Sequence, residues 1–190
     1  MRAELVLLFT VSFVSHYTAD TAFILLPPIA IEWFQWSTVA SRMLMGACGL
    51  FFPIVGLIMA QIVGTPRSLY NSVIVSLSAG IVSCILLVLM KFTAHSDTSR
   101  IPFIGLFIIA NVVCWMFEES LGRQMIAGFL PDDMQSFGLG VRLFCSNPGA
   151  TLAGLLLSVV NENVLIWSAG IGFVTAVYIL LFYHHKSKFY

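Results

Sequence analysis

Long apolar stretches separated by short polar breaks run along the whole chain. Six of them can be delimited, at residues 5–31, 39–63, 69–89, 102–117, 137–160 and 164–182. Within a stretch, apolar residues do not alternate with polar ones at every second position, which argues against the strands of an outer-membrane barrel. Because a helix of about 20 predominantly apolar residues can cross a bilayer, the pattern predicts an all-α membrane protein with six transmembrane helices.

The composition strengthens this prediction. Hydrophobic residues make up 59% of the 190 residues and charged residues 9%, whereas a soluble domain carries about 25% charged residues. The six stretches leave no segment long enough for a soluble catalytic domain, so we expect residues 1–190 to form a single transmembrane domain. The formal net charge is zero, and we expect no nucleic acid as partner.

Two connections between the stretches are longer than the rest. The polar segment 91–100 predicts a solvent-exposed linker that divides the chain into three helices plus three helices. The segment 118–136 contains Pro131, where we expect a break, and its first half, through Leu130, can extend the fourth helix beyond the membrane. The connections thus predict two three-helix units within one bundle.

Small residues recur four positions apart within several stretches. Such pairs allow helix backbones to approach closely in lipid, so tight packing is the first interpretation, and helices that rock against one another are the alternative. The pairs are Gly56 with Ala60 and Gly64, Ser76 with Gly80, and Ala150 with Gly154.

Basic residues indicate how the bundle is oriented. With six spans both termini lie on one side, and a modest excess of basic residues on that side favours cytoplasmic termini. The apolar stretch at the N-terminus resumes at Ala22, so we interpret it as a helix instead of a signal peptide. We interpret the tail around His184 and His185 as a solvated anchor at the interface, and not as a metal site. The basic residues on the side of the termini are Arg2, Arg67, Arg123, Lys186 and Lys188, and those on the other side are Arg42, Lys91 and Arg100.

Three polar residues interrupt the first stretch well inside its ends, namely His16, Tyr17 and Asp20. His16 and Asp20 are four residues apart and therefore stack on one helical face. An Asp at the centre of a transmembrane helix costs about 3 kcal/mol. This cost is tolerated where the carboxyl has a partner, faces a cavity or has a function. We interpret His16 and Asp20 as a candidate proton-coupling or substrate-binding pair, with Tyr17 as a cavity-lining contact. A hydrogen-bonded pair with a structural role is the alternative.

Three further residues are secondary cavity candidates. Asn111 lies in the middle of the fourth stretch, and Glu118 lies seven residues further on the same helical face. Arg142 lies about one turn inside the fifth stretch, where it either extends its charge to the membrane surface or pairs with Glu118 or Glu119. The sequence leaves these two alternatives open.

Prolines mark two places where we expect a helix to kink or end. Pro27 and Pro28 lie near the end of the first stretch, and residues 147–149 (Asn-Pro-Gly) lie near the middle of the fifth. A proline removes a backbone donor, and in lipid the freed carbonyls must be met by neighbours or by water in a cavity. Both places therefore favour a helix beside an internal space, although a simple helix end explains Pro27 and Pro28 nearly as well.

The chain offers little for metal, cofactor or covalent chemistry. Its four cysteines lie in four different apolar stretches without a CxxC pair, and we interpret them as small buried hydrophobes. The absence of a glycine-rich phosphate loop from the sequence argues against ATP-driven transport by this chain. His16 and Asp20 alone are too few for an intramembrane catalytic site, so we expect no enzyme activity, no metal and no cofactor. The cysteines are Cys48, Cys84, Cys114 and Cys145.

Several of these residues resemble the major facilitator superfamily of transporters. The first helix of many proton-driven drug exporters in that family carries Asp-Thr followed by Leu-Pro-x-Ile-Ala, which is similar to Asp20-Thr21 followed by residues 26–30 (Leu-Pro-Pro-Ile-Ala). Residues 131–133 (Pro-Asp-Asp) leading into Gly138-x-Gly140 look like the family's entry to helix five or eleven. The resemblance spans the whole chain at low specificity.

The chain also departs from the family pattern. The family's signature between helices two and three is reduced here to residues 64–67 (Gly-Thr-Pro-Arg), without the acidic residue and the basic pair. Gly154 stands where helix five of the family's antiporters has a proline, although Gly140 and Gly149 keep the spacing before it. The reduced loop suits a C-terminal half of such a transporter, whereas Asp20-Thr21 suits an N-terminal half.

The resemblance implies one six-helix half of a major facilitator-type bundle. Complete members have twelve helices with the substrate between the halves, so the expected partner is a second copy of the chain or another six-helix half. The implied function is secondary active transport of a small solute or ion across a lipid bilayer, with proton coupling as one form of it. The alternative is a non-transporting membrane scaffold or assembly subunit, which the halved length and the reduced loop signature favour.

Overall fold

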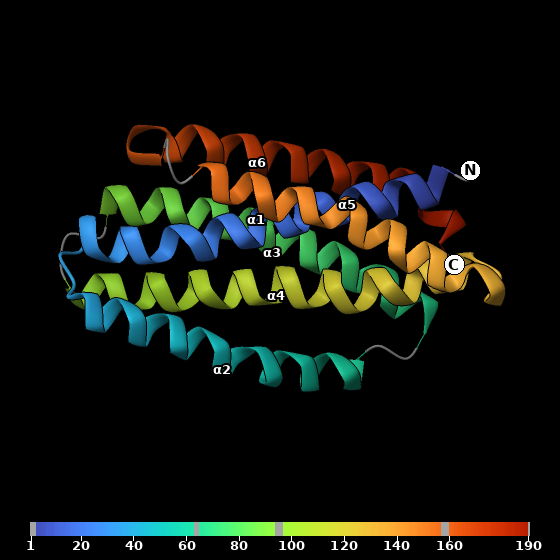
Figure 1. Cartoon of the computed structure of the whole chain (residues 1–190), viewed down its shortest axis with the longest axis horizontal. Coiled ribbons are helices and arrows are strands. Elements are labelled where there is room, and N and C mark those ends of the chain that lie inside the picture. Colours follow the sequence, from blue (N-terminus) through green and yellow to red (C-terminus); the bar gives the residue numbers. More distant parts are fainter. Residues whose placement is uncertain (1–2, 63–64, 94–96, 157–159, 190) are drawn as a thin grey trace.

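The chain folds into a bundle of long antiparallel and parallel helices. The computed structural model describes residues 3–62, 65–93, 97–156 and 160–189, and within these ranges it contains no β-strand. The described residues form six long α-helices and two short 3₁₀ turns (Figure 1). The α-helices are α1 (Ala3–Glu32), α2 (Thr38–Ile62), α3 (Pro66–Thr93), α4 (Asp97–Phe129), α5 (Gln135–Leu156) and α6 (Val160–His184), and the turns are η1 (Asp132–Met134) and η3 (Lys186–Lys188). The prediction of an all-α protein is confirmed.

The prediction of a polar linker at residues 91–100 is wrong. Helix α3 continues to Thr93 and α4 begins at Asp97, so only residues 94–96 separate the two helices. The polar residues of this segment belong mainly to the last turn of one helix and the first turns of the next. The break expected at Pro131 is present, because α4 ends at Phe129 and α5 begins at Gln135.

The internal prolines do not end their helices. Pro27 and Pro28 lie inside α1, which runs on to Glu32, and Pro148 lies inside α5, which runs on to Leu156. The expected break at 147–149 is therefore wrong, as is a helix end at Pro27–Pro28, whereas a kink there, the other form of that expectation, stays a prediction. A proline removes one backbone hydrogen bond, and packing against neighbouring helices can hold the remaining ladder in place.

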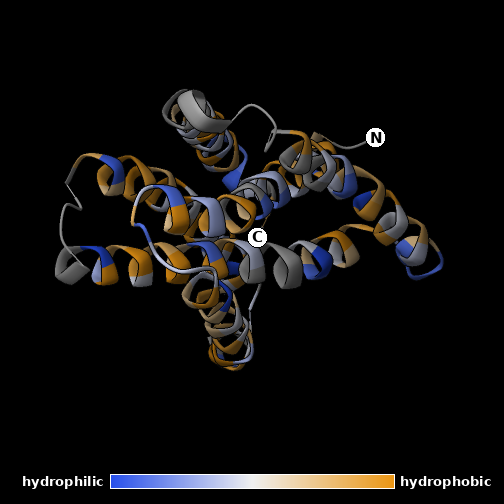
Figure 2. Cartoon of the chain, turned by 60° about the vertical axis from the view of Figure 1, so that its left-hand side comes forward, coloured by the Kyte–Doolittle hydropathy of each residue, from blue (hydrophilic) through white to orange (hydrophobic). Residues whose placement is uncertain are grey.

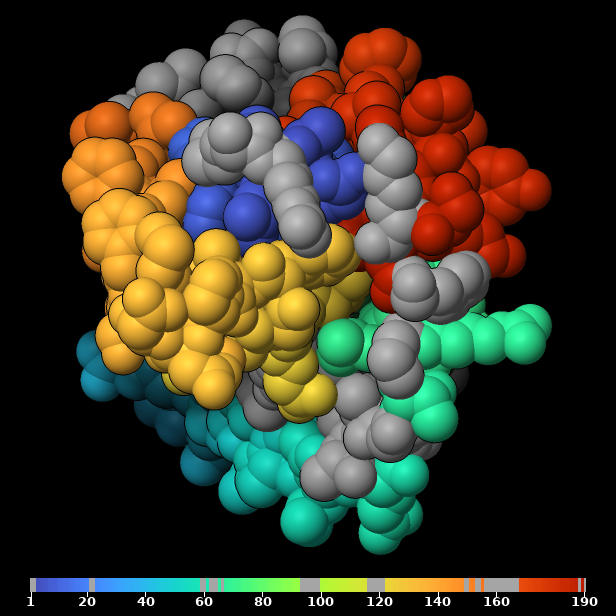
Figure 3. All heavy atoms as spheres, turned by 90° about the vertical axis from the view of Figure 1, so that its right-hand side faces the viewer, coloured from blue at the N-terminus to red at the C-terminus, as the bar shows by residue number. Residues whose placement is uncertain are grey.

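Helices α1, α3 and α4 form the centre of the bundle. Helix α3 packs along α4 and α6, while α1 packs along α5 and α4 and touches α6. Helix α2 lies at one edge, against α4 and α1 (Figure 1). Seen from the end that carries both termini, α1 lies enclosed between α5 and α6 with α4 beneath it (Figure 3).

Gly80 on α3 shows why the central helices pack closely. A Cβ at this position would meet the Cys114 Sγ of α4 at 3.2 Å and the methyl groups of Thr18 and Thr175, on α1 and α6, at 3.8 Å. On the same face of α3, the Ser76 hydroxyl donates to the Cys114 carbonyl at 2.7 Å. The tight packing predicted for Ser76 and Gly80 is thus present, whereas the other two predicted sets include residues whose side chains lie outside the described part.

Large apolar side chains are exposed on the outside of the bundle as well as buried in its core. Figure 2 shows hydrophobic residues distributed along the helices of the bundle. Within the described residues two segments are long and apolar enough to cross a membrane, Thr38–Ile58 in α2 and Arg67–Phe92 in α3. Arg100–Trp115 and Ser168–His184 are shorter apolar helical segments. Large exposed side chains such as Met43 and Phe144, which are 71% and 78% exposed, have the pattern expected of a surface that contacts lipid or another chain.

The C-terminal residues fold back against the end of the bundle. Phe189, which is 6% exposed, lies 5.2 to 5.9 Å, centroid to centroid, from the rings of Tyr70, Phe129 and Phe182. The Tyr70 hydroxyl also donates to the Phe182 carbonyl at 2.9 Å. The tail is therefore only partly the solvated anchor that the sequence suggests, because its exposed polar residues are followed by a buried phenylalanine.

Candidate functional site

The candidate coupling residues lie together in the middle of α1. His16 and Asp20 are half-buried, one turn apart, and interact electrostatically. The Nδ1–H of His16 donates to the Ser12 carbonyl at 2.9 Å. A carbonyl only accepts, so the neutral ring carries its proton on Nδ1, and the ring gains or loses its second proton at Nε2.

Buried hydroxyl groups accompany this pair along α1. The hydroxyls of Ser12 and Thr18 donate to carbonyls one turn earlier, at 3.1 and 2.8 Å. Within the described part of the chain, the Ser15 hydroxyl has no hydrogen-bond partner although the residue is 1% exposed. Residues 12–20 therefore bring two ionisable groups and several hydroxyls into an otherwise apolar bundle.

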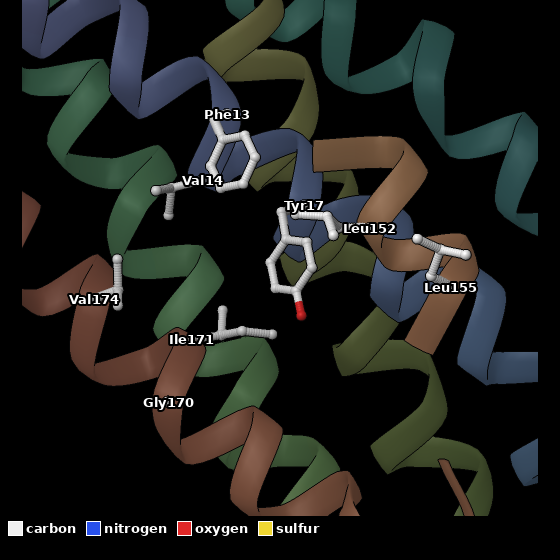
Figure 4. Close-up of a pocket in the computed structure, with 8 residues that line it drawn as sticks. All are labelled: Phe13, Val14, Tyr17, Leu152, Leu155, Gly170, Ile171 and Val174. Atoms are coloured by element: carbon white, nitrogen blue, oxygen red, sulfur yellow. The ribbon is translucent and has the colours of Figure 1, made fainter. Parts of the chain in front are cut away.

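Tyr17 lines a cavity of about 510 Å³ between α1, α5 and α6. Its ring projects into the space, and the hydroxyl is at the far end of the ring (Figure 4). Tyr17 is the single polar side chain among the described lining residues, which do not include His16 or Asp20. The lining residues are Phe13, Val14, Tyr17, Leu152, Leu155, Gly170, Ile171 and Val174.

Asn111 links two helices instead of lining a cavity. It is 1% exposed, its Oδ1 accepts from the Ser83 hydroxyl of α3 at 3.2 Å, and its Nδ2 donates to the Phe107 carbonyl at 2.9 Å. The amide is thus satisfied by contacts within and between α3 and α4. This geometry gives Asn111 a structural role, which the sequence alone did not separate from a place in a cavity.

Arg142 is one of the most deeply buried large side chains of the bundle, at 1% exposure on α5. The sequence left open whether this charge extends to the membrane surface, and its burial argues against that alternative. The side chains of Glu118 and Glu119 lie outside the described part of the structure, so the expected ion pair stays a prediction. A buried guanidinium without an acidic partner would be strongly unfavourable, which supports the pairing.

Sequence reasoning missed the α5 and α6 side of the cavity. Leu152, Gly170 and Ile171 are ordinary residues of apolar stretches, and no local signal distinguishes them from lipid-facing positions. They become lining residues only because α5 and α6 both pack against α1. Gly170 leaves space there, since a Cβ at this position would meet no atom within 4 Å.

Metal ligands do not gather anywhere in the described residues, which contain no group of three or more His, Cys, Asp or Glu side chains able to hold an ion. All four cysteines are free thiols, of which Cys48, Cys84 and Cys114 are buried.

Comparison of the chain with known protein families, with curated proteins and with solved structures gave no match.

Proposed function

We propose that the chain is a multi-pass membrane protein that transports a small solute as one six-helix half of a secondary transporter. All six long helices would cross the bilayer, with both termini in the cytoplasm. His16 and Asp20 would bind the solute or carry the coupled proton, and Tyr17 would line the cavity beside them.

The observation that carries this proposal is the half-buried pair in the middle of α1. His16 and Asp20 interact with each other in the middle of a predominantly apolar helix. Ionisable groups inside a membrane bundle are costly and therefore mark candidate ion or substrate pathways. An interacting His and Asp can exchange a proton with a modest change in energy, which is the property that proton coupling requires.

The pattern of helix contacts supports two three-helix units. Exchanging α1, α2 and α3 with α4, α5 and α6 turns the α1–α5 contact into the α4–α2 contact and the α3–α4 contact into the α6–α1 contact. All four contacts are present, as are α1–α2 and its counterpart α4–α5, but α1–α5 and α3–α4 are far more extensive than their counterparts, and α1–α3 has no comparable α4–α6 contact within the described residues. Internal repeats of this kind are common in secondary transporters.

The edge position of α2 supports a partner. Met43, Leu50 and Leu57 on α2 are 68% to 71% exposed, so the helix offers an extended apolar face beyond the bundle. A second copy of the chain, or another six-helix chain, would cover this face and complete a twelve-helix transporter. Native mass spectrometry in mild detergent should then show twice the 20.9 kDa chain mass or a second polypeptide.

The transport proposal is tested with the purified chain in liposomes that contain a pH-sensitive dye. Amino acids, monosaccharides, carboxylates and nucleosides are added one class at a time, and a transported solute moves protons and changes the dye signal. Asp20→Asn should abolish the signal. Asp133→Asn, which neutralises an exposed carboxyl in η1, is the matched control and should transport like the unchanged chain.

Carbonate extraction establishes that both variants are inserted in the membrane. Undiminished proton movement in an inserted Asp20→Asn chain would remove Asp20 from the mechanism. The scaffold alternative makes the opposite prediction, because it expects no solute response from the unchanged chain and a partner that co-purifies equally with both variants.

A further inference from the structure

The 510 Å³ cavity between α1, α5 and α6 has a chemistry unlike that of the His16–Asp20 pair. Its described lining consists of aliphatic and aromatic side chains, one glycine and the phenol of Tyr17, with no charged group. Its volume lies within the range of about 300–1,000 Å³ typical of ligand sites. Among the described lining residues, a sugar, an amino acid or an inorganic ion would find one hydroxyl and no charge to replace its water.

The cavity is open to the outside of the bundle between α5 and α6. Leu152, Leu155 and Val174, on its α5 and α6 walls, are 45%, 63% and 41% exposed. Helices α5 and α6 both pack against α1, which forms the floor with Phe13, Val14 and Tyr17. In a bundle that spans the bilayer, this opening faces the hydrocarbon, where acyl chains are the most abundant molecules.

An apolar cavity that faces hydrocarbon does not remain empty, because lining atoms without partners lose their dispersion contacts. We propose that the cavity binds one acyl chain of a membrane phospholipid, inserted between α5 and α6 against α1. The absence of a side chain at Gly170 provides the room for the chain. The proposal rests on insertion of the bundle in a membrane and is independent of whether the protein transports a solute.

Gly170→Leu fills the cavity and Ala169→Leu is its matched control. A side chain at position 170 extends from α6 into open space. Ala169 is also exposed on α6, but it lines a different cavity, of about 290 Å³, between α3 and α6. Equal melting temperatures for the two variants would show that any difference in lipid binding does not come from misfolding.

The chain is reconstituted in phosphatidylcholine vesicles that contain a phosphatidylcholine with a photoreactive diazirine in its acyl chain. After irradiation, labelled peptides are mapped by mass spectrometry. The proposal predicts labelling at Tyr17 several-fold above that at Leu180, which is 67% exposed on α6 outside the cavity and reports ordinary contact with surrounding lipid. Gly170→Leu should reduce labelling at Tyr17 to the level of Leu180, while Ala169→Leu should leave it unchanged.

Two results would overturn the lipid site. Labelling at Tyr17 no stronger than at Leu180 would mean that only surrounding lipid touches the cavity. Displacement of the label by a solute that also moves protons in the liposome assay would assign the cavity to the transported solute. A chain that carbonate removes from the membrane would instead contradict the proposed function itself, so failure of one proposal is distinguishable from failure of the other.

Discussion

Helices α2 and α3 both contain a segment that is apolar enough to cross a bilayer, yet they occupy opposite situations in the fold. In an apolar window of 18 residues within the spanning segment of α3, 50% of the residues are buried, against 17% in the corresponding window of α2. Helix α3 packs along two neighbours at the centre of the bundle, whereas α2 touches α4 and α1 from one edge. The more apolar segment is the central one, but both are apolar enough to cross a bilayer, so a second difference between them is needed to explain the contrast in packing.

The difference lies in where the small and hydroxyl-bearing residues sit. On α3, Ser72, Ser76, Gly80 and Ser83 fall on one helical face, and all four are buried. On α2, the small residues include Gly46 and Gly49, which are both exposed, and a Cβ added at either position would meet no atom within 4 Å. A continuous small face on one side of a helix, backed by hydroxyls that bond to neighbours, favours close packing of backbones.

The largest difference between the two helices should appear when leucines are truncated. Leu77 on α3 is 1% exposed and Leu50 on α2 is 70% exposed. Leu77→Ala leaves a cavity between packed helices and should cost about 2–5 kcal/mol, whereas Leu50→Ala should change the free energy of unfolding by less than about 0.5 kcal/mol. Thermal unfolding in detergent, followed by the reaction of a fluorogenic dye with the buried cysteines, measures both. Equal losses would mean that α2 packs as tightly as α3.

Enlarging a glycine should give the next largest difference. Gly80→Leu forces its side chain against Cys114 and Thr175, where even a Cβ meets sulfur at 3.2 Å, and overpacking of this kind costs about 1–3 kcal/mol. Gly46→Leu places the same side chain in open space on α2 and should not destabilise the chain. The same unfolding assay applies, and a stable Gly80→Leu chain would show that α3 and α4 can separate without cost.

The smallest effect concerns the polar link between α3 and α4. Hydrogen bonds between membrane helices contribute about 0.6 kcal/mol on average, and the Ser83 hydroxyl bonds to the Asn111 Oδ1 at 3.2 Å. A double-mutant cycle of Ser83→Ala and Asn111→Ala should therefore give a coupling energy of about 0.5–1 kcal/mol. A coupling energy near zero would mean that Asn111 is held by its bond to the Phe107 carbonyl alone.

The helices could be predicted from the sequence because an apolar stretch of about 20 residues without two-residue alternation is typical of a helix. Their ends were less readable, since polar residues such as Lys91 and Arg100 fit a helix terminus as well as a loop. Arg100 in fact donates to the Phe34 carbonyl at 3.2 Å, and Lys91 lies 5.2 Å from the centroid of the Trp33 ring. Both side chains therefore contact the segment that follows α1, and neither belongs to a solvent-exposed linker.

The candidate site was readable in part. His16 and Asp20 stand out because ionisable residues are rare in apolar stretches, and their four-residue spacing places them on one face of α1. The cavity beside Tyr17 could not be inferred, since it depends on how α5 and α6 pack against α1. Asn111 carried the same signal as Asp20 but is satisfied by Ser83 and Phe107, which only the tertiary structure reveals.

The contacts of Gly80 also bear on the timing of assembly during synthesis. Thr18 precedes Gly80 in the chain and Cys114 follows it closely, but Thr175 emerges 95 residues later. At a translation rate of about 5–20 residues per second, Thr175 of α6 is synthesised roughly 5–19 s after Gly80 of α3. During that interval the central helix depends on α1 and α4 to cover its serine-bearing face, so the order of the helices along the chain protects α3 before the bundle is complete.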